Sequence, residues 1–95
     1  TARHVGQVKW FNNKAGFGFI TMIDGMGKEW DIFTHFSTLV LAHHNGYDQY
    51  KYLVQGEYVE FEISPTNNKG HEFQAMYVTG INSGPLMCET REKSR

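Results

Sequence analysis

The chain has 95 residues, a formal net charge of −1 at pH 7 and an aromatic content of 15%. A chain of this length forms one domain with a single small core and leaves no room for a second domain. A charge balance so near zero is not that of a protein that holds nucleic acid mainly by electrostatic attraction, and a single cysteine, Cys88, excludes a disulfide framework and a thiolate metal cluster.

The sequence also lacks the features of membrane and secreted proteins. No apolar run approaches the length of a membrane span, and the first residues show no basic and then apolar signal segment. We therefore expect a soluble protein of the cytoplasm, or of the nucleus in a eukaryote, with no membrane partner.

Three strand-like runs occupy the first part of the chain, at residues 6–11, 16–22 and 31–36. The connections between them, 12–15 and 24–27, are rich in asparagine and glycine or carry turn residues, which favours antiparallel hairpins. Lysines and an arginine lie in or beside these runs and predict a weakly basic face: Arg3, Lys9, Lys14 and Lys28.

Aromatic rings alternate along the second and third runs. Because a strand points successive side chains to opposite faces, Phe17 and Phe19 share one face of the second run. Phe33 and His35 share one face of the third run for the same reason. The glycine between the two phenylalanines, Gly18, is predicted to let a flat ligand approach the backbone closely.

Alternating phenylalanines in one strand more often form the buried side of a sheet, so the two runs have to be judged together. If all the rings were buried, Ile20 and Ile32 would face solvent, and His35 would lie in an apolar layer without an evident partner. The joint pattern therefore predicts exposed rings. Trp10 shares a face with Val8 on strict alternation, so we expect a β-bulge that brings it to the ring face.

The second half of the chain contains two further strand-like runs, at 57–63 and 73–81, after a long polar segment at 42–55. The run at 57–63 alternates apolar and acidic residues, which predicts that Glu57, Glu60 and Glu62 face outward and form an acidic back. Residues 82–95 show no period and are predicted to be a disordered tail. Five short antiparallel strands without a long amphipathic helix predict an all-β closed barrel, because closure removes exposed edges.

Three stretches carry a family resemblance: Lys9-Trp10-Phe11, Gly16-Phe17-Gly18-Phe19-Ile20 and Asp31-Ile32-Phe33-Thr34-His35-Phe36. In order and spacing they resemble the two ribonucleoprotein motifs of the cold-shock domain family, and the long segment after the third strand is similar to that of the Y-box type. The resemblance implies a domain from residue 4 to 81. It also implies a five-stranded antiparallel oligonucleotide/oligosaccharide-binding (OB-fold) barrel with a long loop between strands 3 and 4.

The same resemblance implies a ligand and a site. The ligand would be single-stranded RNA or DNA, bound with low sequence specificity by an RNA chaperone or a regulator of translation or transcription. Stacking on aromatic rings suits this role because every base has a π face. We expect the nucleic-acid-binding residues to be Lys9, Trp10, Phe11, Lys14, Phe17, Phe19, Asp31, Phe33, His35, Phe36 and Tyr47.

Four residues depart from the simplest version of this pattern. Ala15 stands where the family usually has a lysine or a polar residue, with Lys14 one place earlier to supply the charge. Thr34 replaces the usual valine and points a hydroxyl toward the core, where it needs a hydrogen-bond partner. Trp30 faces the same way as Ile32, which favours packing over base stacking. Tyr77 stands where the family usually has asparagine.

Other site classes receive little support. His43 and His44 would diverge in an extended chain, and no cysteine or carboxylate set completes a metal site around them. Ser37 and His35 lack a third orienting group for nucleophilic catalysis. We therefore expect no enzyme activity, cofactor or metal, and a monomer or at most a weak dimer. The alternative that stays open is a protein-interaction module that uses the same aromatic face.

Overall fold

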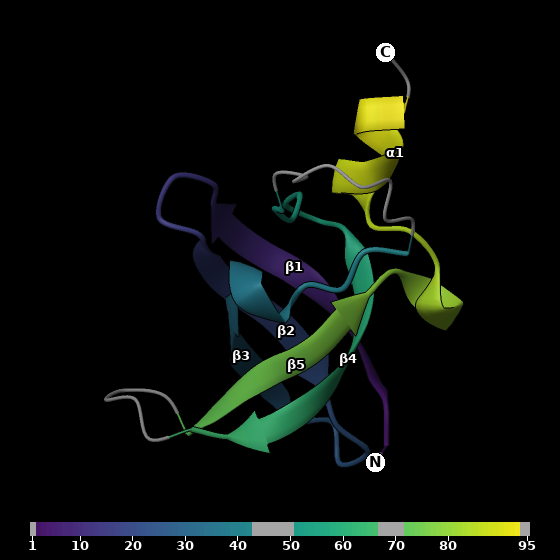
Figure 1. Cartoon of the computed structure of the whole chain (residues 1–95). Helices are drawn as coiled ribbons and strands as arrows, with labels where there is room; N and C mark the ends of the chain where they lie inside the picture. Colours follow the sequence, from purple (N-terminus) through teal and green to yellow (C-terminus); the bar gives the residue numbers. More distant parts are fainter. Residues whose placement is uncertain (1, 43–50, 67–71, 94–95) are drawn as a thin grey trace.

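The computed structural model describes residues 2–42, 51–66 and 72–93 and shows a closed barrel of five strands (Figure 1). The predicted all-β barrel is confirmed, and its long loop lies between the third and fourth strands. Around the barrel the order is β1-β2-β3-β5-β4. The strands are β1 His4–Asn12, β2 Phe17–Ile23, β3 Glu29–His35, β4 Tyr58–Pro65 and β5 Phe73–Thr79.

The pairing of β3 with β5 corrects the expectation of a fully antiparallel barrel. The other four pairs around the ring, β1 with β2, β2 with β3, β1 with β4 and β4 with β5, are antiparallel. Because the ring has an odd number of strands, direction cannot alternate at every pair, so one pair has to be parallel. That pair is β3 with β5, through Phe33 and Gln74.

A β-bulge interrupts β1 at the predicted place. Val8 lies opposite Ile20 and Trp10 lies opposite Phe19, so one residue of β1 is extra between these pairs. Gly18 lies beside this bulge, where an added Cβ atom would collide with the carbonyl oxygen of Trp10. The close approach of β1 is therefore sufficient to require a glycine here, and the predicted reason, access for a flat ligand, stays a prediction.

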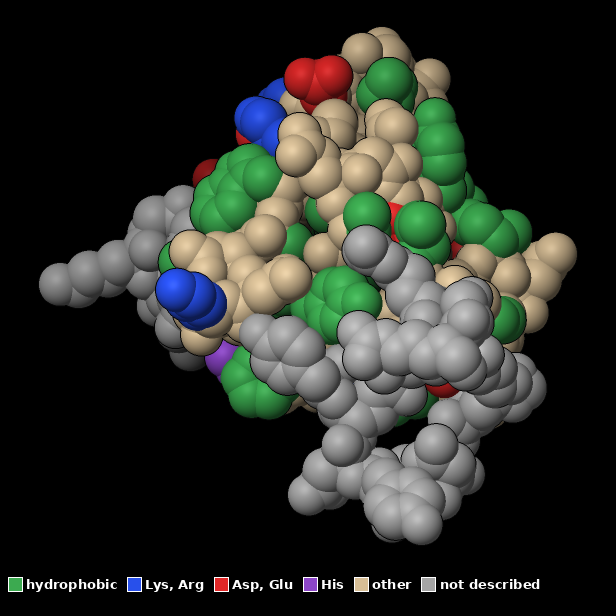
Figure 2. Space-filling view, turned by 90° about the horizontal axis from the view of Figure 1, so that it is seen from above, with side chains coloured by type: hydrophobic (Ala, Val, Ile, Leu, Met, Phe, Trp, Pro, Cys, Tyr) green, Lys and Arg blue, Asp and Glu red, His purple; other side chains and the backbone are tan. Residues whose placement is uncertain are grey.

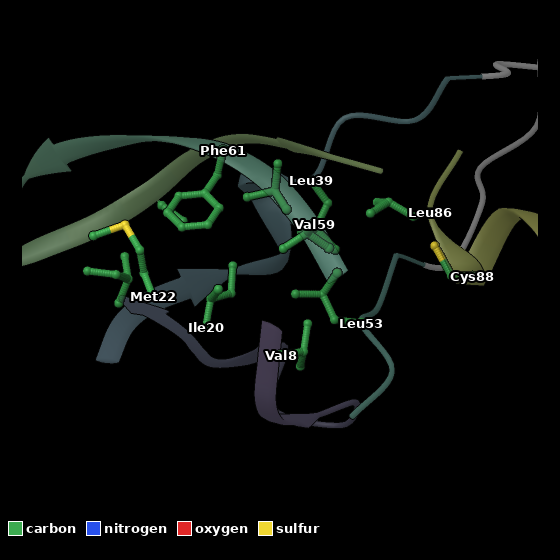
Figure 3. Packing of buried hydrophobic residues seen from close by; sticks show 12 residues of the cluster. Val8, Ile20, Met22, Leu39, Leu53, Val59, Phe61, Leu86 and Cys88 are labelled. Atoms are coloured by element: carbon green, nitrogen blue, oxygen red, sulfur yellow. The ribbon is translucent and has the colours of Figure 1, made fainter. Parts of the chain in front are cut away.

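The core is built from the inward positions of the strands (Figure 3). Val8, Ile20, Val59 and Phe61 are almost completely buried in it. Thr34 is also fully buried, and its hydroxyl donates to the carbonyl oxygen of Ile32 at 3.3 Å. The predicted need for a local partner is thus met without disturbing the strand.

The segment after β5 has regular structure through residue 93, where the sequence predicted a disordered tail. It forms a short 3-10 helix, η2 Ile81–Ser83, and an α-helix, α1 Met87–Lys93. Leu86 and Cys88 are completely buried and lie beside Leu53, which precedes β4 (Figure 3). The segment takes this place because these two side chains complete the core at this end of the barrel.

Two buried carboxylates hold this segment in place. Glu57 is only 7% exposed, which corrects its predicted outward position. Its carboxylate accepts the N–H of Val54 at 3.0 Å and the N–H of Met87 at 2.7 Å. Glu89 accepts the N–H of Leu86 at 2.8 Å and so satisfies another N–H at the start of α1. Burial raises the pKa of Glu57 above its ordinary value.

Trp30 packs at the opposite end of the core, as predicted. Its ring meets Phe73 edge-on at a centroid distance of 6.3 Å, and its Nε1 donates to Asp24 at 2.9 Å. The ammonium group of Lys28 lies 4.1 Å from the centroid of the Trp30 ring, in a cation–π contact. The hydrogen bond from Trp30 lowers the pKa of Asp24. Lys28 therefore contacts Trp30 and lies away from the other aromatic rings on the outer face of β1, β2 and β3.

Arg3 also has a structural role that the sequence did not predict. Its guanidinium donates to the carbonyl oxygen of Tyr77 at 2.5 Å and to the hydroxyl of Thr79 at 2.7 Å, which ties the start of the chain to β5. Tyr77 has a φ of 52°, in the left-handed region where asparagine is favoured among non-glycine residues. This backbone conformation explains why asparagine is the usual residue there in the family that the chain resembles.

The outer surface is mixed in character. In the view from above, hydrophobic side chains form several separate groups with polar surface between them (Figure 2). Within the described ranges, no helix is long and apolar enough to cross a membrane.

Candidate nucleic-acid interface

Four aromatic side chains form one continuous group on the outer face of β1, β2 and β3. The ring centroid of Trp10 lies 5.3 Å from that of Phe19 and 5.9 Å from that of Phe17. Phe33 lies 5.8 Å from Phe19 and 5.9 Å from Phe17. We call Trp10, Phe17, Phe19 and Phe33 the ring platform. Each ring is only partly buried, so flat surface remains open to solvent.

The strand register explains why these rings meet. Trp10 lies opposite Phe19 on β2, and Phe19 lies opposite Phe33 on β3. Without the bulge in β1, Trp10 would share the inward direction of Val8. Edge-on and tilted ring contacts at these distances hold the four side chains in defined orientations.

His35 and Phe36 extend the platform at the end of β3. His35 lies opposite Phe17, and its imidazole centroid is 4.5 Å from the Phe36 ring. Phe36 is 43% exposed and covers Gly16, whose φ of +81° and missing side chain leave room for the ring. The N–H of Phe36 donates to the carbonyl oxygen of Gly16 at 2.8 Å, which fixes the start of the segment that follows β3.

A row of polar side chains borders the platform on the other side. Lys9 and Asp31 form an ion pair at 2.8 Å, and the hydroxyl of Thr21 donates to the other oxygen of Asp31 at 3.2 Å. We call Lys9, Thr21 and Asp31 the polar row. The hydrogen bond to Asp31 raises the pKa of Lys9. Both charged side chains are exposed, so water and salt screen their attraction, and either side chain can bind another partner instead.

The remaining candidates from the sequence differ in their placement. Lys14 is exposed in the turn between β1 and β2, where the side chain of Asn12 accepts the N–H groups of Lys14 and Ala15, both at 2.9 Å. Phe11 packs against the buried core, so it does not join the ring platform. The sequence missed this because the bulge shifts Phe11 as well as Trp10. Tyr47 lies outside the described residues.

The structure adds three neighbours that the sequence analysis did not include. Thr21 belongs to the polar row, and its alternation with Phe19 on the same strand was a usable signal. Gln74 lies opposite Phe33 across the parallel pair, which could not be inferred from an antiparallel barrel. Ser37 contacts His35 through two polar atoms. Among the described residues, no group of three or more His, Cys, Asp or Glu side chains could hold a metal ion.

Comparisons with known proteins show which family the sequence is similar to. The family model described as "'Cold-shock' DNA-binding domain" matches residues 4–81, which includes all five strands. The chain is 50% identical over 62 residues to Cold shock-like protein CspC of Escherichia coli strain K12, over 65% of this chain and 77% of that protein. It is 49% identical over 59 residues to Cold shock-like protein CspE of the same strain, over 62% of this chain and 72% of that protein. Helix α1 lies beyond the residues that the family model matches.

Proposed function

The chain belongs to the cold-shock domain family, and on this basis we propose that it binds single-stranded RNA or DNA on the ring platform. The observation that carries the proposal is the continuous, solvent-facing group of Trp10, Phe17, Phe19 and Phe33, extended by His35 and Phe36. Unpaired bases can stack on such rings whatever their sequence.

The expected affinity follows from the size of the platform. Stacking contributes about 1 to 3 kcal/mol per base. Four bases at about 2 kcal/mol each reach the roughly 8 kcal/mol that corresponds to a micromolar dissociation constant. Because this energy comes mainly from flat contacts, a duplex, whose bases are already stacked on one another, gains little from the platform.

This preference implies a chaperone-like activity. A protein that binds unpaired bases and not paired ones shifts the equilibrium of a hairpin toward its open form by its differential affinity for the two states. We propose that the protein keeps RNA or DNA single-stranded in this way, with binding and not catalysis as its biochemical role.

The two tryptophans allow a direct test. Trp10 is on the platform, whereas Trp30 packs against Phe73 and Lys28 at the other end of the core. The variant Trp30→Phe leaves Trp10 as the only tryptophan, and Trp10→Phe leaves Trp30. Titration with hexathymidine should quench the fluorescence of Trp30→Phe strongly and that of Trp10→Phe weakly, because only Trp10 stacks on a base.

A duplex of the same length and an independent binding assay complete the experiment. The duplex should quench neither variant. If wild-type protein showed neither quenching nor binding to single strands of thymidine or uridine, the proposal would be wrong. The protein-interaction module, in which the rings receive apolar side chains of a partner, would then become the leading interpretation.

A further inference from the structure

The contacts of His35 define which nitrogen of its imidazole carries the proton. The Nδ1 atom lies 3.2 Å from the backbone nitrogen of Ser37 and 2.8 Å from the Ser37 hydroxyl oxygen. A backbone N–H can only donate, so the contact with the Ser37 nitrogen favours the tautomer in which Nδ1 accepts and carries no proton, and the Ser37 hydroxyl can donate to the same atom. In that tautomer of the neutral imidazole the proton sits on Nε2.

Several contacts also fix the orientation of the ring. Phe36 packs on His35 at a centroid distance of 4.5 Å, and Phe17 lies opposite it on β2. The imidazole accepts from Ser37 at the start of η1 Phe36–Thr38, where the hydroxyl of Thr38 donates to the carbonyl oxygen of His35 at 2.8 Å. Among the described residues, Nε2 has no hydrogen-bond partner. The ring thus offers a face for stacking and, in its plane, one oriented donor.

We propose that the Nε2–H group of His35 donates a hydrogen bond to an acceptor oxygen of the bound strand, and that Ser37 is the residue that positions this donor. The proposal rests on the proposed function and refines it, because the phenylalanines of the ring platform offer only faces. The acceptor is either a phosphate oxygen or a base carbonyl oxygen. Thymine, uracil, cytosine and guanine carry carbonyl oxygens whereas adenine has none, so the second source would disfavour adenine at one position of the strand.

The protonation state can be measured before any ligand is added. Long-range proton–nitrogen NMR spectra distinguish a protonated ring nitrogen from a bare one, and the variant His35→Phe identifies the signals of this residue. In the neutral imidazole we expect a protonated Nε2 and a bare Nδ1. A protonated Nδ1 would overturn the proposal.

The positioning role of Ser37 has its own comparison. The variant Ser37→Ala removes the hydroxyl donor and should raise the fraction of the Nδ1-protonated form, while affinity falls by about twofold at most, because only the competent fraction binds. The matched control is Thr38→Ala, which removes a hydrogen bond of the same short helix without touching the imidazole and should leave the nitrogen signals unchanged. Equal signals in Ser37→Ala and wild type would remove the assigned role of Ser37.

The donor itself is tested by combining His35→Phe with modified strands. This variant keeps a ring for stacking and loses the N–H, so its affinity for hexathymidine should fall by about fivefold. In one set of strands each phosphate in turn becomes a methylphosphonate. In a second set each thymine in turn becomes difluorotoluene, which keeps the flat shape without carbonyl oxygens. The loss caused by His35→Phe should disappear for one strand of one set, and that strand identifies the acceptor.

The outcomes distinguish failure of the His35 donor from failure of single-strand binding as a whole. Wild-type binding with the same His35→Phe effect on every strand, or with no effect at all, would overturn the donor role and leave the proposed function standing. No binding by wild type to any strand would overturn both.

Discussion

At the scale of single residues, Gly18 sets how closely β1 and β2 approach beneath the ring platform. A Cβ atom there would meet the backbone of Trp10 and Phe11, which cannot move aside as a flexible side chain can. We expect Gly18→Ala to lower the free energy of unfolding by about 2 to 3 kcal/mol, the cost of overpacking a tight site. Urea denaturation measures it.

A second glycine provides the control for this prediction. Gly25, in the turn between β2 and β3, has no atom within 4 Å of an added Cβ, so Gly25→Ala should change stability by less than about 0.5 kcal/mol. A Gly18→Ala protein with wild-type stability but weakened binding would instead favour the interpretation in which Gly18 admits a flat ligand.

Some features of single residues could be predicted from the sequence and others could not, for a physical reason. The bulge at Trp10 could be predicted because strict alternation left this ring on the wrong face. The placement of Phe11 and the reason for Gly18 could not, because both depend on how the extra residue of β1 redirects the chain after the bulge. Tyr47 stays a prediction.

At the scale of elements, the segment with α1 is the largest addition to the barrel. Leu86 is fully buried, whereas its neighbour Met87 is 41% exposed. We expect Leu86→Ala to destabilise the protein by about 2 to 5 kcal/mol through lost burial and a residual cavity. Met87→Ala is the matched control and should cost less than about 0.5 kcal/mol. Similar midpoints for the two variants in thermal and urea unfolding would show that the segment contributes little.

The carboxylate of Glu57 links this segment to pH. Burial raises its pKa above the ordinary value of 4.5, so the folded protein holds the proton more tightly than the unfolded chain does. The resulting stability is fully present below the ordinary pKa and is lost as pH rises through the raised value. Glu57→Gln removes this titration but also removes one of the two hydrogen bonds, because an amide nitrogen cannot accept, so the variant should be less stable than wild type at low pH.

The measurement is the difference in unfolding free energy between wild type and Glu57→Gln at several pH values. The advantage of wild type should shrink as pH rises from about 4 toward neutrality, because only wild type loses the bound proton there. Glu60 is a suitable site for a comparison variant. Its carboxylate also accepts a backbone N–H, that of Asn82 at 2.8 Å, but Glu60 is less buried than Glu57. A difference that stays constant with pH would contradict the assignment to Glu57.

The elements themselves show what a sequence pattern can reveal. All five strands carry clear alternation and were predicted within a few residues of their observed bounds. Helix α1 has seven residues, too few for a helical period to stand out, and among its described side chains and the residue before it only Leu86, Cys88 and Glu89 are buried. Its place depends on the hydrogen bond from Met87 to Glu57 and on the core that Leu86 and Cys88 share with Leu53, residues that are distant in the sequence.

At the scale of the whole molecule, the closed barrel and the ring platform depend on different features of the sequence. Five short strands were enough to predict a closed barrel. That one pair of neighbouring strands is parallel follows from their odd number. The ring platform required motifs whose residues lie on three strands and meet only through their register. The acidic surface predicted from Glu57, Glu60 and Glu62 is smaller than expected, because Glu57 is buried and Glu60 accepts a backbone hydrogen bond.

The distribution of charge leads to a last prediction, on salt dependence. With a net charge of −1, Arg3 engaged at β5 and Lys28 placed over Trp30, few cations remain near the ring platform. Each phosphate contact with a single strand contributes about −0.7 to the slope of log affinity against log salt. About three contacts therefore predict a shallow slope of about −2.

Two lysine variants make this prediction specific. Lys14 is exposed in the turn next to Phe17, so Lys14→Ala should reduce the magnitude of the slope by about 0.7, the share of one phosphate contact. Lys28→Ala removes the same charge at the other end of the barrel and should leave the slope unchanged. Titrations of hexathymidine from low to high salt measure all three slopes. Equal slopes in wild type and Lys14→Ala would show that Lys14 contacts no phosphate, and a much steeper wild-type slope would mean that charge, and not stacking, dominates binding.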